Sequence, residues 1–526
     1  MHVDVIEEFG ALEEVRGDWE AVYAADPEAS LFMSWRWIAD CLATHRTVWL
    51  VLAAKPTQAD DRYVAFLPLR MRVHFDKERG FFNELYLAGG GYSDHAGLLV
   101  HPEFEAAAVS AFTDHLRKKL NWARLTLANL WISERRRRLF LSAFDELRFT
   151  HKDINYVDEI TKTDNNICPS IALPSDWDAY LAGLSANNRQ KIRRWLRKVD
   201  ASEEYGVTLA DDAETCARDI DVLLGLWKTR WAGRTGAKAE PIVRRNRAML
   251  TRCAENGTLF LPVFRHGDRP VAALGVLVDH AKKAMLFFIA GRDETFDAAP
   301  AGYLLHAYSI RHAITKGFAT YDFLLGNEPY KYVFASQERR LRACSVATRS
   351  GRNLGGAPDP RGLEAMRDVV LDLERKNEVA TAESACRQIL AMQPNDALTL
   401  YRLGRLLAAR GDHAEAAPLF SRSVAVEPEG GNAWLKLALS LHALGDDAGA
   451  LKACREAVRL QPTNEDARRL ILQLALPAQR TSATTRLWPD VGEGGLAPDW
   501  MQGGPAGWGA PHPGVAGNDP TTKARA

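Results

Sequence analysis

The chain lacks the features that mark exported, membrane-spanning or nucleic-acid-binding proteins. Its 67 basic and 67 acidic side chains cancel, so no net field favours a nucleic acid or an anionic membrane. It contains no apolar run of about 18 residues, the length that spans a bilayer. The acidic N-terminus, "MHVDVIEEFGALEEVRGDWE", has no apolar core of a signal peptide. We therefore expect a cytoplasmic protein with no membrane span and no DNA partner.

Paired cysteines are also missing. The seven cysteines are scattered, and none of them forms a Cys-x-x-Cys pair. Scattered thiols are typical of reduced intracellular proteins. No His/Cys cluster has the spacing of a zinc site, so the sequence predicts no bound metal.

The most regular part of the 526 residues is C-terminal. Pro394, Pro428 and Pro462 recur every 34 residues, and Gly411 and Gly445 keep the same period. That period resembles the tetratricopeptide repeat, in which each unit is a pair of helices joined by a turn. The two clear units span 397–430 and 431–464, and a weaker unit spans 363–396. With its capping helix, the whole repeat region covers 363–476.

The resemblance implies that this all-α solenoid binds a protein or peptide. Candidate contacts on the first helices of the pairs are Tyr401, Arg402, Arg405 and Lys436. A Gly- and Pro-rich linker, 350–362, precedes the repeats. The segment 477–526 holds nine Gly and seven Pro with little apolar periodicity, so we expect it to be disordered.

Upstream of the linker, apolar patterning predicts a mixed α+β domain. Short polar turns, "RHGDR" and "DHAKK", separate three apolar runs and favour an antiparallel meander. The expected order is helix, helix, three strands, helix and strand. These elements span 216–231, 242–256, 258–264, 270–278, 284–290, 301–316 and 319–325.

That order resembles the core of the GNAT (Gcn5-related N-acetyltransferase) fold. Residues 177–326 further resemble the acetyltransferase domain of the CelD/BcsL-like family, which is associated with bacterial cellulose biosynthesis. The stretches that carry the resemblance are "WDAYLAGLSANNRQKIRRWLRKVD", "LWKTRWAG", "RPVAALGVLV", "PAGYLLHAYSIRHAITKGFATYDFLLG" and "EPYK". In this family and in FemAB-like aminoacyltransferases, two GNAT-like halves often share one chain. The resemblance therefore implies a degenerate half over 1–155 and an acyltransferase domain over 156–349.

The resemblance also implies an acetyl-CoA donor. In the GNAT fold the last meander strand splays from the strand that follows the helix, and the pantetheine arm lies in that gap. Backbone N–H groups near Phe288 and Ala290 would then bind the thioester carbonyl. The pyrophosphate would lie at the helix start, at Ala301 and Gly302. The usual phosphate loop, Gln/Arg-x-x-Gly-x-Gly/Ala, is reduced to the single glycine of "DAAPAGY", so an aminoacyl-tRNA donor remains an alternative.

Ionisable residues bracket the last apolar strand in "YDFLLGNEPYKYVFA", residues 321–335. Asp322 is a candidate general base, and Tyr330 is a candidate acid for the leaving thiolate. Lys331 is a candidate phosphate contact on the donor or the acceptor. In the alternative interpretation Asp322 braces a neighbouring loop and Lys331 is a solvated charge.

Basic residues gather in "NNRQKIRRWLRKV", residues 187–199. Arg189 and Arg193 share one helical face and are candidate contacts for a phosphorylated sugar, CoA or tRNA, although a solvated face is the plainer interpretation. Arg234 lies in "RWAGRTGAK", which suits a mobile substrate loop. His95, in "YSDHAG", is expected to be structural because its half is expected to be degenerate.

Taken together, these resemblances imply a GNAT-type acyltransferase that moves an acetyl group from acetyl-CoA to an amine or hydroxyl. By resemblance the acceptor is an exopolysaccharide or envelope precursor, and the repeats recruit a protein partner. Two alternatives stay open. One is a FemAB-like aminoacyltransferase that uses aminoacyl-tRNA, and the other is a non-catalytic scaffold that acts through the repeats.

Overall fold

The computed structural model describes residues 1–44, 47–89, 93–159, 161–236 and 239–475, without the side chains of 232–235. The segment 477–526, expected to be disordered, lies outside the described residues. Contacts divide the chain into two compact units. The first contains Met1–Arg72 and Glu84–Leu354, and the second contains Val73–Asn83 and the described chain from Gly355 onward.

The first half of the first unit is built on a mixed sheet of order β1-β2-β3-β4-β6-β16-β7, with β5 beside β3. Its strands are β1 (His2–Ile6), β2 (Trp49–Lys55), β3 (Ala65–Asp76), β4 (Gly80–Leu87), β5 (Leu99–Val100), β6 (Arg124–Leu130), β7 (Phe149–Asp153) and β16 (Arg342–Thr348). Its helices are α1 (Phe9–Glu14), α2 (Arg16–Ala25), α3 (Trp35–Thr44), α4 (Glu105–Lys119) and α5 (Glu134–Leu141). The apolar run of β2 is buried on both faces, as helices on both sides of a sheet require.

Strand β16 changes the boundary that the sequence suggested between the halves. All of 156–349 was expected to belong to the second half. The strand instead lies between β6 and β7 and is antiparallel to both. The chain therefore returns to the first sheet before it enters the second unit. Such a return depends on long-range strand pairing, which local patterning does not reveal.

The second half is built on a sheet of order β15-β8-β14-β13-β12-β11-β9, with β10 beside β12. Its strands are β8 (Ile167–Ala172), β9 (Tyr205–Thr208), β10 (Leu259–Phe260), β11 (Val263–His266), β12 (Arg269–Asp279), β13 (Ala284–Arg292), β14 (Thr320–Asp322) and β15 (Gln337–Arg340). The predicted order of helices and strands is confirmed except that β10 is an additional strand, and the antiparallel meander β11-β12-β13 is confirmed.

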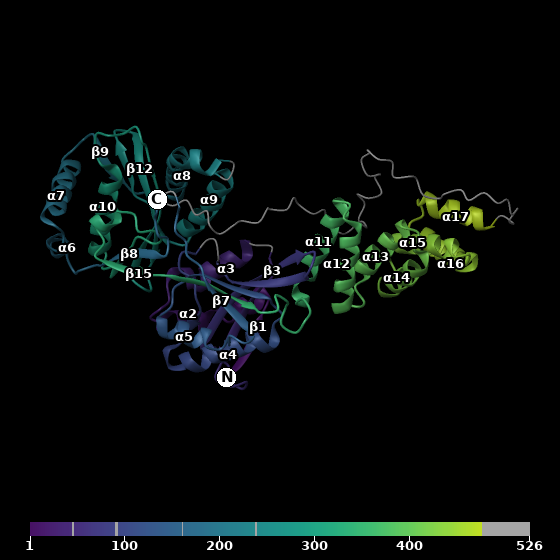
Figure 1. Cartoon of the computed structure of the whole chain (residues 1–526). Coiled ribbons are helices and arrows are strands. Elements are labelled where there is room, and N and C mark those ends of the chain that lie inside the picture. Colours follow the sequence, from purple (N-terminus) through teal and green to yellow (C-terminus); the bar gives the residue numbers. More distant parts are fainter. Residues whose placement is uncertain (45–46, 90–92, 160, 237–238, 476–526) are drawn as a thin grey trace. The chain divides into compact units, whose positions relative to one another are not determined.

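Helices cover both faces of this second sheet (Figure 1). They are α6 (Trp177–Gly183), α7 (Ala186–Asp200), α8 (Ala213–Thr235), α9 (Ala239–Glu255) and α10 (Ala301–Thr315). Helix α8 packs closely on β13 because Gly291 has no side chain, and a Cβ there would lie 2.5 Å from the carbonyl oxygen of Leu223.

Two local expectations for this half were wrong. The run 258–264 is not one strand, because β10 and β11 are separate on either side of Leu261 and Pro262, and proline cannot donate to a ladder. The basic loop expected at 230–238 is helical as far as Thr235, since α8 continues through the glycine at 233.

The two halves share a hydrophobic core. Trp19 and Phe32 of the first half cluster with Trp227, Leu286 and Leu324 of the second. In addition, the hydroxyl of Tyr23 donates a hydrogen bond to Asp279 at 2.5 Å. The two sheets therefore belong to one folded body.

The second unit consists of stacked helix pairs (Figure 1). They are α11 (Leu363–Arg375) with α12 (Val379–Met392), α13 (Ala397–Ala409) with α14 (His413–Val426), and α15 (Gly431–Ala443) with α16 (Asp447–Leu460), followed by α17 (Glu465–Ala475). Gly411 and Gly445 take φ values of +90° and +84° at the turns. Asn377, 34 residues before Gly411, takes φ +58°. Asn377 thus takes the place of the turn glycine that the first repeat, 363–396, lacks.

The turn end of the β3–β4 hairpin, Val73–Asn83, belongs to this second unit. Phe81 is buried in the repeat core beside Met366 and Cys386. Its backbone N–H donates to the Gln388 side chain at 2.9 Å. The hairpin therefore covers the first helix pair, which the sequence analysis did not foresee. No helix in the described ranges is long and apolar enough to cross a membrane.

Candidate active site

Strands β13 and β14 pair in parallel over three residues and then separate. The last pair is Leu286 with Asp322. Beyond this pair β13 continues to Arg292. The N–H of Phe323 instead points away from β13, toward β8, and donates to the carbonyl of Pro169 at 2.9 Å. The gap that the GNAT resemblance implied therefore begins directly after Leu286.

A backbone distortion produces this separation. Leu324 has φ +53°, a left-handed conformation that is rare for a residue with a branched side chain. Its N–H donates to Oδ1 of Asp322 at 2.7 Å, which holds the turn. The strand expected over 319–325 consequently ends at Asp322. Backbone strain of this kind is concentrated at functional sites.

The two residues expected to meet the thioester lie on β13. The register of β12 and β13 shifts between Gly275 and Val276, and β13 carries one extra residue there, Phe288. Such a bulge re-aims the backbone. Ala290 follows two residues later and is half-buried. A donor contact of either residue stays a prediction.

The start of α10 offers a place for an anion. The helix begins at Ala301 after Pro300, and no side chain of the described residues caps it. A Cβ built on Gly302 would meet no described atom within 4 Å. Uncapped N–H groups and the helix dipole favour a phosphate at such an end. These residues therefore fit the pyrophosphate of a CoA thioester.

Helix α7 lies against this end of α10. The hydroxyl of Tyr303 donates to the carbonyl of Asn188 at 3.4 Å. The ammonium of Lys191 lies 4.7 Å from the centroid of the Tyr303 ring. Lys191 therefore brings a positive charge to the first turn of α10, although the sequence analysis did not single it out.

The predicted arginines of the substrate site have local partners. Arg189 donates to the carbonyl of Ala182 at 3.3 Å, and Arg193 pairs with Asp178 at 3.1 Å. Exposed pairs of this type contribute little to stability. Arg234 lies in the last turn of α8, and its side chain is outside the described part of the structure. Ligand roles for all three stay predictions.

Asp322 faces away from α10. Leu286 and Leu324, its neighbours on the same face, pack in the core shared by the two halves. Phe287 and Phe323 instead pack against α10. The acyl gap thus has α10 on one face of the sheet and Asp322 on the other.

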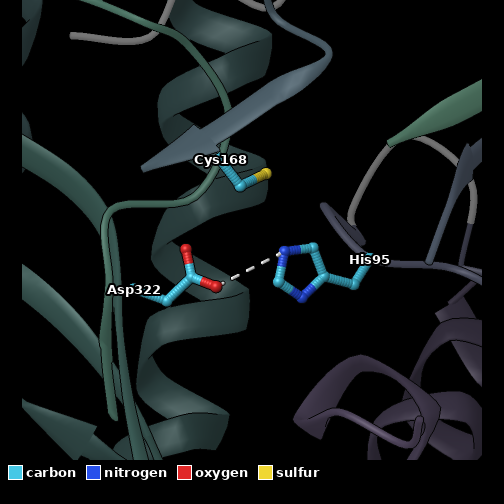
Figure 2. Close-up of side chains that lie close together, drawn as sticks. All are labelled: His95, Cys168 and Asp322. Carbon is cyan, nitrogen blue, oxygen red and sulfur yellow. Dashed lines mark ion pairs between the residues drawn. The ribbon is translucent and has the colours of Figure 1, made fainter. Parts of the chain in front are cut away.

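Three side chains meet on the Asp322 face (Figure 2). Nε2 of His95, from the first half, lies 3.9 Å from Oδ2 of Asp322. Cys168 of β8 completes the group, and one possible ligand atom from each residue lies within 4.8 Å of the other two. All three are buried, with exposures of 1% for His95, 0% for Cys168 and 4% for Asp322. His95 was expected to have a structural role, and its position beside Asp322 was not predicted from the sequence.

Burial raises the pKa values of both the Asp322 carboxyl and the Cys168 thiol, with different consequences for their reactivity. Burial raises the pKa of Asp322 to about 6, although the Leu324 N–H, Lys331 and Arg339 oppose the increase. This carboxyl is therefore ionised near neutral pH and close to the pKa of an efficient proton acceptor. Burial and the charge of Asp322 raise the pKa of the Cys168 thiol. Such a thiol is a poor nucleophile.

Trp131 holds the imidazole in place. The His95 ring lies 3.8 Å from the Trp131 ring with an interplanar angle of 12°. The guanidinium of Arg339 lies 3.6 Å from the same indole. Arg339 is also the β15 residue opposite Cys168. Aromatic and cationic stacking therefore fixes the ring that faces Asp322.

Lys331 and Tyr330 follow the turn, as expected, but their surroundings differ from the prediction. The Lys331 ammonium donates to the carbonyls of Leu325 (2.7 Å) and Gly326 (3.0 Å) and pairs with Glu328 (2.9 Å). Two hydrogen bonds and one ion pair thus hold the ammonium, so the structure supports a bracing role, and a ligand contact stays a prediction. Burial raises the pKa of Tyr330, which keeps its phenol protonated.

His306 of α10 was not predicted as a site residue from the sequence. Its ring lies 4.6 Å from Phe287 and 5.3 Å from Phe323, on the α10 side of the gap. Nδ1 is 3.3 Å from the Tyr321 hydroxyl. Burial, helped by Lys331, lowers its pKa to about 3, so the imidazole is neutral at physiological pH. The available signal was the presence of two polar residues, His306 and Ser309, within the apolar stretch "YLLHAYSI".

The group His95, Cys168 and Asp322 also has the residue types of a metal site. Spacing along the sequence did not reveal it because the three lie in distant segments. Lys331 and Arg339 already act on the same carboxylate and thiol, which disfavours an added cation. The absence of a metal therefore stays a prediction.

The candidate peptide contacts of the repeats lie on α13 and α15, as expected. Arg402 pairs with Glu374 at 2.7 Å, and the Arg405 guanidinium lies 5.7 Å from the Tyr401 ring. Burial, followed by the charge of Arg405, lowers the pKa of Lys436. A peptide contact for these residues stays a prediction.

Comparison with known proteins agrees with this division of the chain. Residues 186–332 match the family model of the acetyltransferase (GNAT) domain, and residues 368–425 and 401–465 match that of the tetratricopeptide repeat. The chain therefore carries a GNAT acetyltransferase domain followed by tetratricopeptide repeats. No curated protein matches it.

Several solved structures are similar to part of the chain. The tetratricopeptide domain of Sgt2 from Aspergillus fumigatus is 19% identical over 25% of this chain and 95% of that one, with a TM-score of 0.21. The first such domain of Spaghetti, bound to an HSP90 peptide, is 14% identical over 22% and 92%, with a TM-score of 0.21. A Thermobaculum terrenum O-GlcNAc transferase mutant is 25% identical over 21% of this chain and only 22% of that one, with a TM-score of 0.20.

Proposed function

We propose that this protein is an acyltransferase that moves an acetyl group from acetyl-CoA to an amine or hydroxyl acceptor, while its repeats recruit a protein partner. The observation that carries the proposal is the separation of β13 from β14 after Leu286, within the segment that matches the GNAT domain. It is supported by the uncapped start of α10 on one face of the sheet and by an ionisable carboxyl on the other.

On the donor side, the N-terminal N–H groups of α10 would hold the pyrophosphate, and Gly302 leaves room for it. The pantetheine arm would pass between β13 and the chain after Asp322. Backbone groups near Phe288 and Ala290 would then orient the thioester carbonyl. Neutral His306 and the aromatic side chains around it would exclude water from this side of the gap.

On the acceptor side, the amine or hydroxyl would approach from the face that carries Asp322. The acceptor atom forms a bond to the acyl carbon, and the thioester C–S bond breaks. The acceptor gives up its proton on this face, where the Asp322 carboxyl, with a pKa of about 6, is ionised near neutral pH. The CoA sulfur leaves and takes up a proton, and the protonated phenol of Tyr330 is the candidate hydrogen-bond donor to it.

The acceptor and the setting are proposed from the family resemblance. An exopolysaccharide or envelope precursor, as in bacterial cellulose biosynthesis, would meet the enzyme in the cytoplasm, where acyl-CoA is made. The seven cysteines are all free thiols in the structure, which is consistent with a reducing compartment.

Calorimetric titration of acetyl-CoA into the full chain tests the proposal. We expect saturable binding with one site per chain, and release of the CoA thiol when an amine or a sugar is added. A matched titration with an aminoacyl-tRNA should give no comparable binding. Absence of acetyl-CoA binding would contradict the proposal and favour the scaffold alternative.

A further inference from the structure

We propose that the first half of the first unit completes the active site: His95 is the catalytic residue that takes the acceptor's proton, and Asp322 is the positioning residue that holds its imidazole. This inference rests on the proposed acyl transfer. It assigns an active role to a half that the sequence analysis expected to be degenerate, and it requires both halves for one reaction.

The orientation of the Asp322 carboxylate supports this division of roles. Oδ1 accepts the hydrogen bond of the Leu324 N–H at 2.7 Å. Oδ2 faces Nε2 of His95 at 3.9 Å, about 1 Å longer than a hydrogen bond between heavy atoms. Catalytic hydrogen bonds are often this long before substrate binds and shorten in the complex. Both oxygens are therefore directed at protein groups, and the imidazole is the group through which the carboxylate can act.

The backbone around His95 fixes the ring. The N–H of Ala96 donates to the carbonyl of Asn129, and the N–H of Trp131 donates to the carbonyl of Ala96, both at 2.8 Å. This bridge places Trp131 where it stacks on His95 at 3.8 Å. Phe32 meets the same ring edge-on at 5.5 Å. Four contacts thus hold a histidine from a loop in one orientation toward the second half, which general-base catalysis requires.

The proton balance of the step is simple. As the acceptor nitrogen or oxygen bonds to the acyl carbon, its proton moves to Nδ1 of His95, because Nε2 faces the Asp322 carboxylate, and the C–S bond of the thioester breaks. The imidazolium that forms is stabilised by the ionised Asp322 carboxylate beside it. The proton then leaves with the CoA thiol, so no further reactant is needed.

Two other uses of the same side chains fit less well. A covalent acyl-Cys168 would need a thiolate, but burial and the Asp322 charge raise the pKa of that thiol. A bound zinc would add a third cation to a site that already faces Lys331 and Arg339. Proton transfer to His95 beside Asp322 needs neither a thiolate nor a bound metal.

A comparison of two nucleophiles tests the inference on the full chain. Ethanolamine is protonated at neutral pH and needs a base, whereas hydroxylamine is already neutral and needs little help. With acetyl-CoA as donor, His95→Gln should lose CoA release with ethanolamine by about 10²–10⁴-fold, the usual contribution of a general base. It should keep the parental rate with hydroxylamine within a few-fold. His312→Gln, a half-buried histidine stacked on Phe260 at 4.4 Å, is the matched control and should behave like the parent.

Other outcomes overturn the inference. His95→Gln and a second variant, His95→Asn, could lose the same fraction of the transfer rate with ethanolamine and with hydroxylamine. If these two variants still bind CoA, that result would show that His95 has a structural role. Parental rates with ethanolamine would show that the base lies elsewhere. An acetyl adduct on Cys168, or one equivalent of zinc that His95→Gln loses, would assign the group to different chemistry. Failure of the proposed function is distinguishable, because the parent itself would then bind no acetyl-CoA or transfer to neither nucleophile.

Discussion

Replacing Asp322 with asparagine separates the catalytic value of this carboxyl from its effect on stability. The side chain is 4% exposed, and burial raises its pKa from 3.8 to about 6. Because one pKa unit corresponds to about 1.4 kcal/mol, ionising this group in the folded protein lowers the free energy of unfolding by about 3 kcal/mol. The folded state binds this proton more tightly than the unfolded chain does. The loss of stability is therefore absent below about pH 4, grows as the pH rises to about 6, and is constant above that.

Asparagine removes the charge but keeps an oxygen that can accept the Leu324 N–H. At pH 7 we expect Asp322→Asn to be at least as stable as the parent, with a gain of up to about 3 kcal/mol, and at pH 4 we expect no gain. Acyl transfer should fall at least tenfold, since the pair with His95 loses its charge. Urea unfolding at both pH values and the rate of CoA release, measured on one preparation, check both parts.

The matched control is Asp26, a fully buried aspartate whose two oxygens lie 2.9 and 3.1 Å from Arg136. Asp26→Asn should lower the free energy of unfolding by about 3 kcal/mol, because it breaks a buried ion pair, without a specific loss of rate. The reasoning is refuted if Asp322→Asn behaves like this control, with the parental rate and lower stability at pH 7. Asp322 would then only brace the turn at Leu324.

Three further variants test other parts of the account. Gly302→Val should weaken acetyl-CoA binding at least tenfold in calorimetry. It should change the free energy of unfolding by no more than about 0.5 kcal/mol, because no described atom lies near the new side chain. The control is Gly225→Val, at a helical glycine with equally open surroundings, which should bind acetyl-CoA as the parent does. Lys331→Met should lower the free energy of unfolding of the first unit by about 3–5 kcal/mol in urea, since Glu328 is left without its ion-pair partner. Phe81→Ala should destabilise the repeats by about 3–5 kcal/mol. The isolated fragment 363–475 should have a lower melting temperature than the repeats of the full chain. Equal melting temperatures would show that the hairpin does not stabilise the repeats.

Local periodicity was sufficient for the repeats and for the order of elements in the second half. The 34-residue spacing of prolines and glycines fixed the helix pairs, and α11 begins at Leu363 as expected. The antiparallel meander followed from short polar turns between apolar runs. These features depend on neighbours in sequence, so patterning could find them.

Contacts between distant segments were not predictable in this way. Asp322 was found because it begins an apolar strand, but nothing in "YSDHAG" indicated that His95 would lie beside it. His95, Cys168 and Asp322 lie far apart in the sequence, so no local metal-ligand spacing indicated that they meet. The placement of β16 in the first sheet and of Phe81 in the repeat core likewise depends on long-range pairing and docking.

The pairing of Leu286 with Asp322 and the separation that follows are the centre of the account. A crystal structure of the full chain with CoA at saturating concentration tests it most directly. We predict electron density for the pantetheine arm between β13 and the chain after Asp322, with the pyrophosphate at the start of α10, beside Ala301 and Gly302. Density for CoA at any other place, or none at saturation, would contradict the assignment of this gap as the donor site.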